Sequence, residues 1–416
     1  MNRAARLPAL LVTVVLSLVL VGASAPPPMP KADLAATPPM GWSSWNAFGC
    51  RINEQLVRET ADAMVASGMA VAGYRYVDVD DCWMAPVRGP DGRLQADHQR
   101  FPSGIKALAD YVHARGLKFG IYSSAGLATC EGRPASLHHE TVDARTFADW
   151  GVDLLKYDNC YATEEPAVER YQAMARALQS TGRHILYAIC EWGYNRPWQW
   201  AAASGGHTWR TTPDIADNWR TVMAILDRQV PLVHYGGPNG WNDMDSLEIG
   251  NGGMSTEEDR AHLSLWALLN APLIAGNDLR SMSPTTRAML TNADVLAIDR
   301  DWAGTQGRLA GSDGVHQVWT KPLSTGGIAV VFLNRDRHPA VIATTAQILK
   351  LPPARDYRVH DVWTGSTVAS ASVSGADGDI SASGADGDLS ASGADGDLSA
   401  TVPPHAVKMY VMTPEN

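Results

Sequence analysis

The sequence predicts an α/β fold in which a (β/α)8 TIM barrel is followed by a C-terminal antiparallel β-sandwich. From residue 40 to about residue 300, short β-branched or aromatic runs alternate with amphipathic segments of helical length, which is typical of repeated βα units. After about residue 302, short strand-like runs follow one another with turn residues between them, which indicates an all-β domain. The length of 416 residues fits a barrel of about 250 residues with an appended domain.

Eight apolar runs are the expected barrel strands, with helices such as 53–67, 105–115 and 165–181 between them. The strands are Met40–Trp45, Tyr74–Asp78, Lys118–Tyr122, Asp153–Tyr157, His184–Ile189, Thr208–Arg210, Leu232–Tyr235 and Leu273–Ala275. A doubly wound open sheet is the alternative, but no glycine-rich phosphate-binding turn follows any of these runs. Eight βα alternations therefore favour the closed barrel.

The N-terminus has the pattern of a secretory signal peptide. Arg3 and Arg6 precede the apolar run Leu7–Val21, and Ala23-Ser24-Ala25 resembles a cleavage site for signal peptidase. A membrane anchor is the alternative, but the run is short for a span of about 20 residues. We therefore expect a signal peptide at 1–25, a catalytic barrel at 26–302 and a β-domain at 303–416, in a protein that is secreted and has no membrane association after cleavage.

The expected β-domain contains a low-complexity repeat. Its strands are expected at 314–319, 327–334, 357–362 and 406–412, and three tandem copies of Ser-Gly-Ala-Asp-Gly-Asp-(Ile/Leu)-Ser-Ala occupy 374–400. The aspartates of the repeat suggest calcium as an alternative, but their spacing matches no EF-hand loop. Because this composition buries little apolar surface, we expect the insertion at 374–400 to be a flexible, solvated loop.

Composition excludes several classes of function. A net charge of −10 argues against a nucleic-acid partner, because no basic stripe exists to replace phosphate counterions. The five cysteines, Cys50, Cys82, Cys130, Cys160 and Cys190, show no CxxC spacing of a zinc site. The pair Asp80 and Asp81 suggests Mg²⁺ as an alternative, but no phosphate-binding motif accompanies it, so we expect no metal and no cofactor. An odd number of cysteines in an exported protein leaves at least one outside any intramolecular bridge.

Polar and aromatic side chains collect just after the expected strands, and in a barrel all of these positions lie at the carboxyl end, where active sites are built. They are Trp45, Asp80, Asp81, Tyr122, Lys156, Asp158, Glu191, Trp192, Arg210, Asp214, Asp243 and Asp245. Acidic residues scattered over the surface would not all occur just after expected strands. The sequence therefore predicts a catalytic site at this end of the barrel.

Two of these carboxylates suggest the chemistry. Asp158 lies two residues after Lys156, and Asp214 lies four residues after Arg210. Two carboxylates in different electrostatic settings can act as nucleophile and as proton donor on a sugar acetal. We expect Asp158, beside a cation, to be ionised and Asp214 to be the protonated acid. An aspartate at a strand end can also be a simple helix cap, so the assignment depends on the other motifs.

Five ordered motifs resemble glycoside hydrolase family 27, the α-galactosidases and α-N-acetylgalactosaminidases. They are Thr37-Pro-Pro-Met-Gly-Trp-Ser-Ser-Trp-Asn46, Asp78-Val-Asp-Asp-Cys-Trp83, Lys156-Tyr-Asp-Asn-Cys160, Cys190-Glu-Trp-Gly193 and Trp241-Asn-Asp-Met-Asp245. The similarity is close over about residues 36–310 and loose over the β-domain. Any one of these motifs alone is weak evidence for the resemblance, whereas all five in this order are specific to the family.

The resemblance implies a role for each matching position. Asp158 matches the nucleophile, Asp214 matches the acid/base, and Lys156 and Arg210 match sugar contacts. Asp80 and Asp81 match the pair that holds the 4- and 6-hydroxyls of galactose. Glu191 matches a residue near the 2-position of the sugar. The other implied substrate-binding residues form the walls of the pocket: Trp45, Tyr122, Trp192 and Asp245. Core packing is the alternative for the two tryptophans, and a turn or cap for the aspartate pair.

The resemblance also implies disulfides Cys50–Cys82 and Cys130–Cys160. Cys190 has a partner in animal relatives at the position of Gly206, so here we expect Cys190 to be a buried free thiol. Met244 and Ser246 stand where the family usually has Pro and Met. The rim of the pocket that this segment forms can therefore differ in shape from that of the family.

The sequence thus predicts a secreted, retaining α-galactosidase that acts on an α-galactoside oligosaccharide or polysaccharide. A β-L-arabinopyranosidase should replace an acid that binds the 6-hydroxyl, and an α-N-acetylgalactosaminidase should have small residues in place of Glu191. From a different class, a galactose-binding lectin would not need both Asp158 and Asp214. The natural leaving group and the oligomeric state are not predicted by the sequence.

Overall fold

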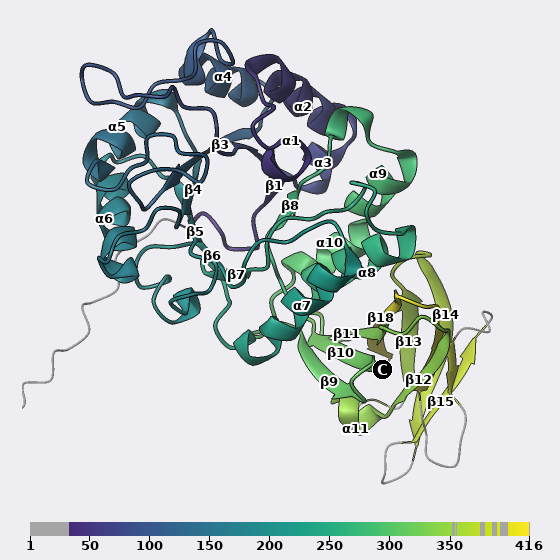
Figure 1. The fold of residues 1–416 in the computed structure, drawn as a ribbon. Helices are drawn as coiled ribbons and strands as arrows, with labels where there is room; N and C mark the ends of the chain where they lie inside the picture. The colour runs from purple at the N-terminus through teal and green to yellow at the C-terminus, as the bar shows by residue number, and fades with distance from the viewer. Residues whose placement is uncertain are drawn as a thin grey trace, which may run out of the picture.

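The computed structural model describes residues 33–351, 354, 356–374, 379–384, 389–391 and 398–415. It contains a curled parallel sheet surrounded by helices, followed by an antiparallel β-domain, as Figure 1 shows. The fold class predicted from the sequence is confirmed. The expected signal peptide lies outside the described residues. No helix in the described part of the chain combines the length and the apolar character that a membrane crossing needs.

Eight parallel strands form the barrel sheet in the order β7-β6-β5-β4-β3-β2-β1-β8. The sheet closes through Leu247, which lies just after β7 and forms a parallel bridge with Ala275 of β8. The Leu247 amide donates to Ile274 O at 2.7 Å, and the Gly276 amide donates to Leu247 O at 2.9 Å. The strands are β1 (Met40–Ser43), β2 (Tyr76–Val79), β3 (Lys118–Ser124), β4 (Leu154–Asp158), β5 (Leu186–Cys190), β6 (Thr208–Arg210), β7 (Trp241–Asp243) and β8 (Leu273–Ala275).

The seventh predicted strand is wrong. Residues 232–235 do not form a strand: Leu232 ends the 3-10 turn Val230–Leu232, and Tyr235 is 41% exposed. The strand is instead β7, which pairs with β6 from Trp241 to Asp243. Trp241 is fully buried, and its indole nitrogen donates to Ala35 O at 2.8 Å. The position of the seventh strand was therefore decided by the long-range packing of Trp241 and not by the short apolar run beside Pro231.

Helices cover the outside of the sheet, and their ends follow local signals. Asn53 caps α2 by accepting from the Leu56 amide, and Ser255 and Glu258 form a capping box at α8. The three helices predicted by range correspond to α2, α4 and α6, with ends shifted by one or two residues. The helices are α1 (Trp45–Phe48), α2 (Glu54–Ala66), α3 (Met69–Ala72), α4 (Gly104–His113), α5 (Glu140–Trp150), α6 (Ala167–Ser180), α7 (Trp219–Gln229), α8 (Thr256–Leu268), α9 (Pro284–Leu290) and α10 (Ala293–Arg300).

Unusual backbone angles occur where several of the strands end. Cys82, Tyr161, Trp192 and Asp245 follow β2, β4, β5 and β7, and all have positive φ, between 50° and 75°. Such angles are costly for residues other than glycine and cluster at functional sites. Four of the ten non-glycine residues with positive φ in the described part of the chain therefore follow barrel strands at the carboxyl end of the sheet.

The C-terminal domain is one sheet that folds over its own core. Ile342 and Leu398 from one end of the sheet pack with Val330 and Phe332 near its other end. The strand order is β12-β17-β16-β15-β14-β13-β18-β11-β10-β9. The elements are β9 (Arg308–Ser312), β10 (His316–Pro322), β11 (Ile328–Asn334), β12 (Ala340–Thr344), α11 (Ala346–Leu349), β13 (Asp356–Asp361), β14 (Ser366–Ser374), β15 (Asp379–Gly384), β16 (Leu389–Ala391), β17 (Leu398–Val402) and β18 (Ala406–Glu415).

The expectation that 374–400 is a loop without regular structure is wrong for the described part of this segment. The copies of the repeat supply β15, β16 and the start of β17, which pair in succession as antiparallel neighbours. Leu398 and Ala400 of the last copy are 1% exposed and belong to the core of the domain. Residues 375–378, 385–388 and 392–397 lie outside the described residues. Backbone pairing between short repeated segments therefore outweighs their low apolar content.

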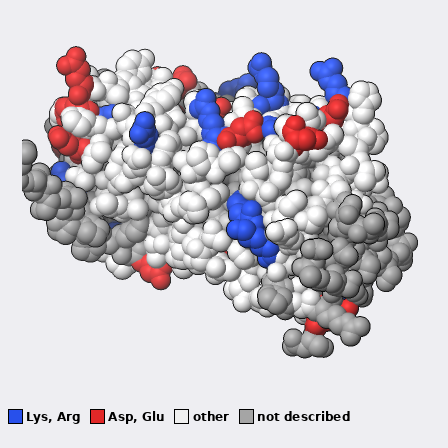
Figure 2. All heavy atoms as spheres, turned by 90° about the horizontal axis from the view of Figure 1, so that it is seen from below, with Lys and Arg blue, Asp and Glu red and all other residues white. Residues whose placement is uncertain are grey.

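The two domains share a continuous apolar core. Trp319, Val331 and Met409 of the β-domain belong to the same buried cluster as Trp266 of α8. Trp363 also donates from its indole nitrogen to Ser264 of α8 at 3.0 Å. In Figure 2, most of the acidic and basic side chains lie along the upper edge of the view, some of them side by side, and the face below is formed mainly by other residues.

The strand directions in the repeat predict that copies can be removed only in pairs. β14, β15, β16 and β17 alternate in direction, and β17 must run antiparallel to β12 and then reach β18 through Pro403-Pro404-His405. Deleting 374–391, which is two copies, preserves the direction of the last strand. Deleting 374–382, which is one copy, reverses it.

We expect the two-copy deletion to melt within a few degrees of the full chain, and the one-copy deletion to melt well below it, by roughly 4 °C or more. Differential scanning calorimetry of the three proteins measures this. Equal melting temperatures for the two deletions would show that the strand ladder contributes nothing to the fold.

Candidate active site

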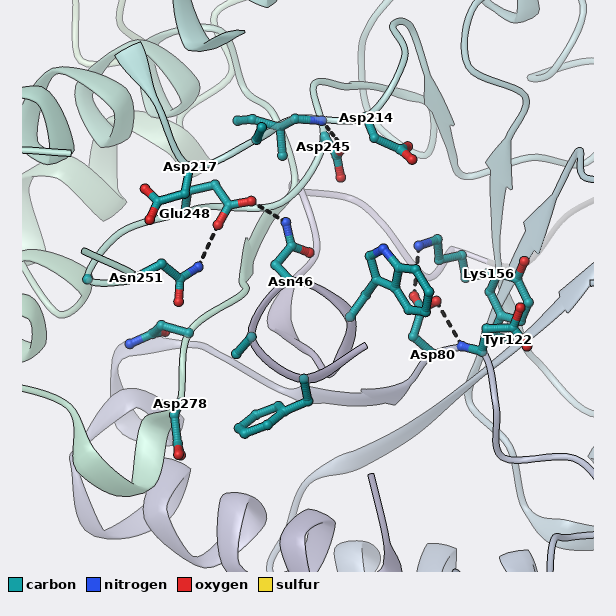
Figure 3. A pocket seen from close by; sticks show the side chains of 18 of the residues that line it. Asn46, Asp80, Tyr122, Lys156, Asp214, Asp217, Asp245, Glu248, Asn251 and Asp278 are labelled. Carbon is teal, nitrogen blue, oxygen red and sulfur yellow. Dashed lines mark hydrogen bonds and ion pairs between the residues drawn. The ribbon is translucent and has the colours of Figure 1, made fainter. Parts of the chain in front are cut away.

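A cavity of about 840 Å³ opens at the carboxyl end of the barrel strands (Figure 3). Its wall contains residues from the ends of every strand of the barrel except β5. Nine of the residues predicted from the sequence line it: Trp45, Asp80, Asp81, Tyr122, Lys156, Asp158, Arg210, Asp214 and Asp245. These residues, which follow different strands in the sequence, therefore lie together in one site.

Two predicted substrate-binding residues do not line this cavity. Glu191 is fully buried and accepts hydrogen bonds from the backbone and side-chain nitrogens of Asn195 at 2.6 to 3.0 Å. Trp192 packs edge-on against Tyr194, with ring centroids 5.7 Å apart. Both residues are absent from the cavity wall. The turn after β5, in which Trp192 has a φ of 62°, directs Glu191 toward its own loop and away from the cavity.

Asp158, the last residue of β4, lies at the base of the cavity and is 5% exposed. Its Oδ2 accepts from the Tyr122 hydroxyl at 2.9 Å, and its Oδ1 accepts from the Asn159 amide at 2.9 Å. One donor on each oxygen fixes the plane of the carboxyl group. A carboxylate held in this way is oriented for attack on an atom placed above it.

Lys156 and Asp80 form an ion pair beside Asp158. The Lys156 Nζ lies 2.7 Å from Asp80 Oδ2, and both side chains are largely buried. The Ser43 hydroxyl also donates to Asp80 Oδ2, at 3.3 Å. Although burial lowers the pKa of Lys156, the Asp80 carboxylate and other nearby negative charges raise it well above the ordinary value. Lys156 is therefore a permanent cation in the cavity.

Asp81 connects the loops after β2 and β3. Its Oδ1 accepts from the Cys82 amide at 2.6 Å, and its Oδ2 accepts from the Glu131 amide at 2.9 Å. Burial raises the pKa of Asp81, and these donors oppose the rise. The disulfide Cys130–Cys160 then joins the same loop to the end of β4. The wall formed by Asp80 and Asp81 is thus held to the strand that carries Asp158.

Arg210 organises the opposite wall. Its Nη2 lies 2.7 Å from Asp214 Oδ1 and 2.8 Å from Asp245 Oδ2, and the guanidinium is buried. Asp245 also accepts from the Ile215 amide at 2.8 Å and the Ser246 amide at 2.7 Å. One guanidinium therefore positions two carboxyl groups. Asp245 is buried, whereas the Asp214 side chain is 64% exposed to the cavity and to solvent.

The pKa values of the two central carboxyls differ in the opposite direction to the one expected. Burial raises the pKa of Asp158 to about 6, even though Lys156 and the Asn159 amide oppose this. Desolvation raises the pKa of Asp214 too, but the charges of Arg210 and Lys156 outweigh it and leave the pKa lowered. The expectation from the sequence considered the nearest cation of each residue and could not include the depth of Asp158.

Two disulfides, Cys50–Cys82 and Cys130–Cys160, are present, and Cys190 is a buried free thiol. These are the pairs that the resemblance implies. A Cβ at Gly206 would lie 2.7 Å from Ile189 Cδ1 and 3.0 Å from Ala201 O. A side chain at residue 206 would therefore require the end of the Ile189 side chain to shift.

Met244 and Ser246 lie outside the cavity wall. Met244 is 1% exposed and belongs to the main apolar core, and neither residue lines the cavity. Asp245 between them is held with a φ of 75°, which turns its carboxyl group toward Arg210 while Met244 points into the core.

Metal binding is not favoured by the residues present. Among the described residues, two groups place enough sulfur and carboxylate atoms together: Cys50, Cys82 and Glu131, and Cys130, Asp158 and Cys160. Both groups consist of a complete disulfide plus one carboxylate. A disulfide supplies no thiolate ligand, so neither group has the donors of a metal site.

Several lining residues were not predicted from the sequence: Asn46, Phe48, Asp217, Glu248, Asn251, Asn277 and Asp278. Asn277 and Asp278 follow β8 closely, so the argument from strand ends could have found them. Glu248 and Asn251 follow β7, which was predicted nine residues too early in the chain. Glu248 and Asn251 lie farther along the chain than Asp243 and Asp245, which were predicted from the sequence.

The site combines paired carboxylates with different pKa values, two fixed cations and an aromatic wall in a cavity large enough for a sugar and its substituent. This combination defines a glycoside hydrolase. Residues 37–301 match the family described as Alpha galactosidase A, and residues 313–412 match the Alpha galactosidase C-terminal beta sandwich domain. The chain therefore belongs to the α-galactosidase family, glycoside hydrolase family 27.

Individual relatives agree with this. The chain is 47% identical over 384 residues to an α-galactosidase of Cyamopsis tetragonoloba, covering 92% of this chain and 88% of the relative. It is 52% identical over 314 residues to α-galactosidase A of Cellvibrio japonicus, covering 73% and 77%. The crystal structure of α-galactosidase I from Mortierella vinacea superposes with a TM-score of 0.83 at 35% identity, covering 92% and 98%.

Proposed function

We propose that this chain is a secreted, retaining α-galactosidase that removes terminal α-D-galactosyl residues from oligosaccharides or polysaccharides. The observation that carries the proposal is the cavity in which Asp158 lies at the base and Asp214 at the exposed wall, each beside its own cation. The similarity to proteins named α-galactosidases, over most of their length, supports the galactosyl specificity. Two disulfides and the N-terminal leader pattern support secretion.

The first step forms a covalent glycosyl-enzyme. A carboxylate oxygen of Asp158 bonds to the anomeric carbon, the bond from that carbon to the leaving oxygen breaks, and the proton of Asp214 passes to the leaving oxygen. Tyr122 and the Asn159 amide hold the attacking carboxylate in one orientation. In the second step, water attacks the same carbon, gives its proton to Asp214 and releases Asp158. Two inversions return galactose with its original configuration.

The low pKa of Asp214 in the free protein has a consequence for binding. A bound sugar displaces water from the exposed Asp214 side chain, and loss of water favours the neutral form of a carboxyl group. Substrate binding therefore raises the pKa of Asp214 toward the protonated form that the first step needs. Arg210 remains paired with the buried Asp245 while this occurs.

Asp80 and Asp81 favour galactose over arabinopyranose, which lacks the exocyclic CH₂OH of galactose. Both carboxyls line the cavity, and two carboxylate acceptors there suit the 4- and 6-hydroxyls of galactose. Glu191 makes no contact with the cavity, so the expectation that it excludes a 2-acetamido group has no support from its position. Activity on an α-N-acetylgalactosaminide will show whether the protein discriminates against N-acetylgalactosamine.

A panel of 4-nitrophenyl glycosides tests the specificity directly. With purified mature protein, we expect kcat/KM for the α-galactoside to exceed that for the β-L-arabinopyranoside by roughly tenfold or more, because the arabinoside leaves the acceptors for the 6-hydroxyl unpaired. The α-N-acetylgalactosaminide is the third member. A preference for either of the other two glycosides would replace the proposed substrate.

Removal of the nucleophile tests the mechanism. Asp158→Gly should lose at least roughly a thousandfold in kcat, and azide should restore cleavage of an activated aryl α-galactoside because a small anion fits the vacated space. The product should be β-galactosyl azide, identified by NMR. Asp214→Gly with azide should give α-galactosyl azide, because Asp158 is intact there. Near-normal turnover in Asp158→Gly would exclude Asp158 as the nucleophile.

The raised pKa of Asp158 predicts a pH profile. In Asp214→Asn acting on 2,4-dinitrophenyl α-galactoside, whose leaving group departs without a proton, the rate depends on ionised Asp158 alone. Because burial raises the pKa of Asp158 to about 6, the carboxyl is protonated and inactive below that pH and active above it. We expect kcat/KM to rise about tenfold per pH unit below this value and then to level off. A profile without a limb near pH 6 would contradict the assignment.

A further inference from the structure

Asp78 is a buried carboxyl group that the proposed mechanism does not use. It lies in β2, two residues before Asp80, and it is 4% exposed. Its neighbours across the sheet are Ser43 of β1 and Gly120 of β3. A Cβ at residue 120 would lie 2.7 Å from Asp78 Oδ1, so the absence of a side chain there makes room for the carboxyl group. Asp78 is therefore packed into a defined place inside the barrel.

One hydroxyl group lies between Asp78 and Asp80. Ser43 Oγ is 3.2 Å from Asp78 Oδ2 and 3.3 Å from Asp80 Oδ2, and all three residues are buried. A serine hydroxyl has a single hydrogen to donate, whereas an ionised carboxylate only accepts. If both carboxyls were ionised, one of these two contacts would bring two oxygens together with no hydrogen between them. The geometry therefore needs a second hydrogen, on one of the two carboxyl groups.

Asp80 is the ionised member of this pair. Its Oδ2 lies 2.7 Å from Lys156 Nζ (Figure 3), and its Oδ1 accepts from the Asp81 amide at 2.8 Å. Asp78 lacks such support, because its Oδ1 is buried and has no hydrogen-bond partner among the described residues. A buried oxygen without a donor costs much less on a neutral carboxyl group than on a carboxylate. The second hydrogen therefore belongs to Asp78.

The charges around Asp78 agree with this placement of the hydrogen. Burial and the negative charge of Asp80 raise the pKa of Asp78 to about 7, while the Lys156 ammonium and the Ser43 hydroxyl oppose the rise. On β3, the residue that faces Asp78 is Gly120, which has no charge. The other titratable or charged residues near it line the same small cavity inside the barrel, of about 60 Å³: Tyr76, Cys190, Arg210, Asp243 and Asp245. Asp78 is therefore neutral below about pH 7 and loses its proton as the pH rises through that value.

We propose that Asp78 is a positioning residue for the sugar-binding wall: it donates a hydrogen bond to Ser43, which in turn donates to the Asp80 carboxylate. This proposal rests on the proposed function, because it acts through the contact of Asp80 with galactose. Asp80 Oδ2 is then held by the Ser43 hydroxyl and by Lys156, and its Oδ1 by the Asp81 amide. Three donors fix the plane of the carboxylate and leave its remaining lone pairs in a defined direction. Each hydrogen bond of such a chain also strengthens the next.

Kinetics with 4-nitrophenyl α-galactoside, at one pH below 7, test the chain of hydrogen bonds. Asp78→Ala and Ser43→Ala should each raise KM by roughly fivefold and leave kcat within about twofold, because the contact of Asp80 with the sugar is weakened equally in the ground state and the transition state. In Asp78→Asn, the amide nitrogen replaces the missing donor, so KM should return to within about twofold of the wild-type value. The double variant Ser43→Ala/Asp78→Ala should show about the same KM as either single variant, because Asp78 acts through Ser43.

Asp299→Ala is the matched control. Asp299 is also fully buried, and neither of its carboxyl oxygens has a hydrogen-bond partner among the described residues, but it lies in α10 and does not line the active-site cavity. This variant should keep the wild-type KM even where its melting temperature falls. An equal rise of KM in Asp299→Ala and Asp78→Ala would overturn the proposal, because Asp78 would then act only through stability. Additive rises in the double variant, or a fall of kcat at unchanged KM in Asp78→Ala, would overturn it too.

Infrared difference spectroscopy tests the proton on Asp78 without any substrate. A protonated carboxyl group has a carbonyl stretching band that a carboxylate lacks. The difference between the spectra of the wild type and Asp78→Asn should contain this band at low pH and lose it as the pH rises through about 7. Absence of the band at every pH would overturn the positioning role and leave the proposed function intact. A wild-type protein that shows the band but cleaves no α-galactoside would overturn the proposed function, and the positioning role with it.

Discussion

The site depends on the compensation of many carboxylates by two buried cations. Eight acidic residues line the cavity, and Lys156 and Arg210 are the only Lys or Arg side chains among its described lining residues. Lys156 pairs with Asp80 beside Asp158, and Arg210 pairs with both Asp214 and Asp245. Without these pairs, like charges in a low-dielectric setting would neutralise or separate. Burial raises the pKa of Asp158 against the effect of Lys156, whereas the charges of Arg210 and Lys156 lower the pKa of Asp214.

The barrel makes this arrangement possible because parallel strands end at one rim. Backbone amides and one disulfide then fix the rim: Asp81 accepts from the Glu131 amide, and Cys130–Cys160 joins the same loop to β4. The closure of the sheet through Leu247 places the chain after β7 next to β8. Glu248 and Asn251, which follow Leu247 in the chain, line the cavity beside this closure.

Much of the fold and nine of the 25 residues that line the cavity could be predicted from residue patterns. Seven of the eight barrel strands, the helices α2, α4 and α6, and nine cavity residues follow from local periodicity and from the phase of polar residues after strands. The misplaced strand at 232–235 and the strands within the repeat could not be predicted in this way. In both cases, pairing with a distant segment decided the outcome: β7 pairs with β6, and β17 pairs with β12.

The sequence by itself determined the order of the βα units and the residue types at the strand ends, because these are properties of neighbouring residues. Only the tertiary structure decided how those residues act. Asp158 has a raised pKa because it lies at the base of a cavity, and Asp214 has a lowered one because it lies at the exposed wall beside Arg210. Glu191 turns to Asn195 and does not line the cavity. Burial, side-chain direction and hydrogen-bond satisfaction depend on segments far apart in the chain, so no local pattern contains them.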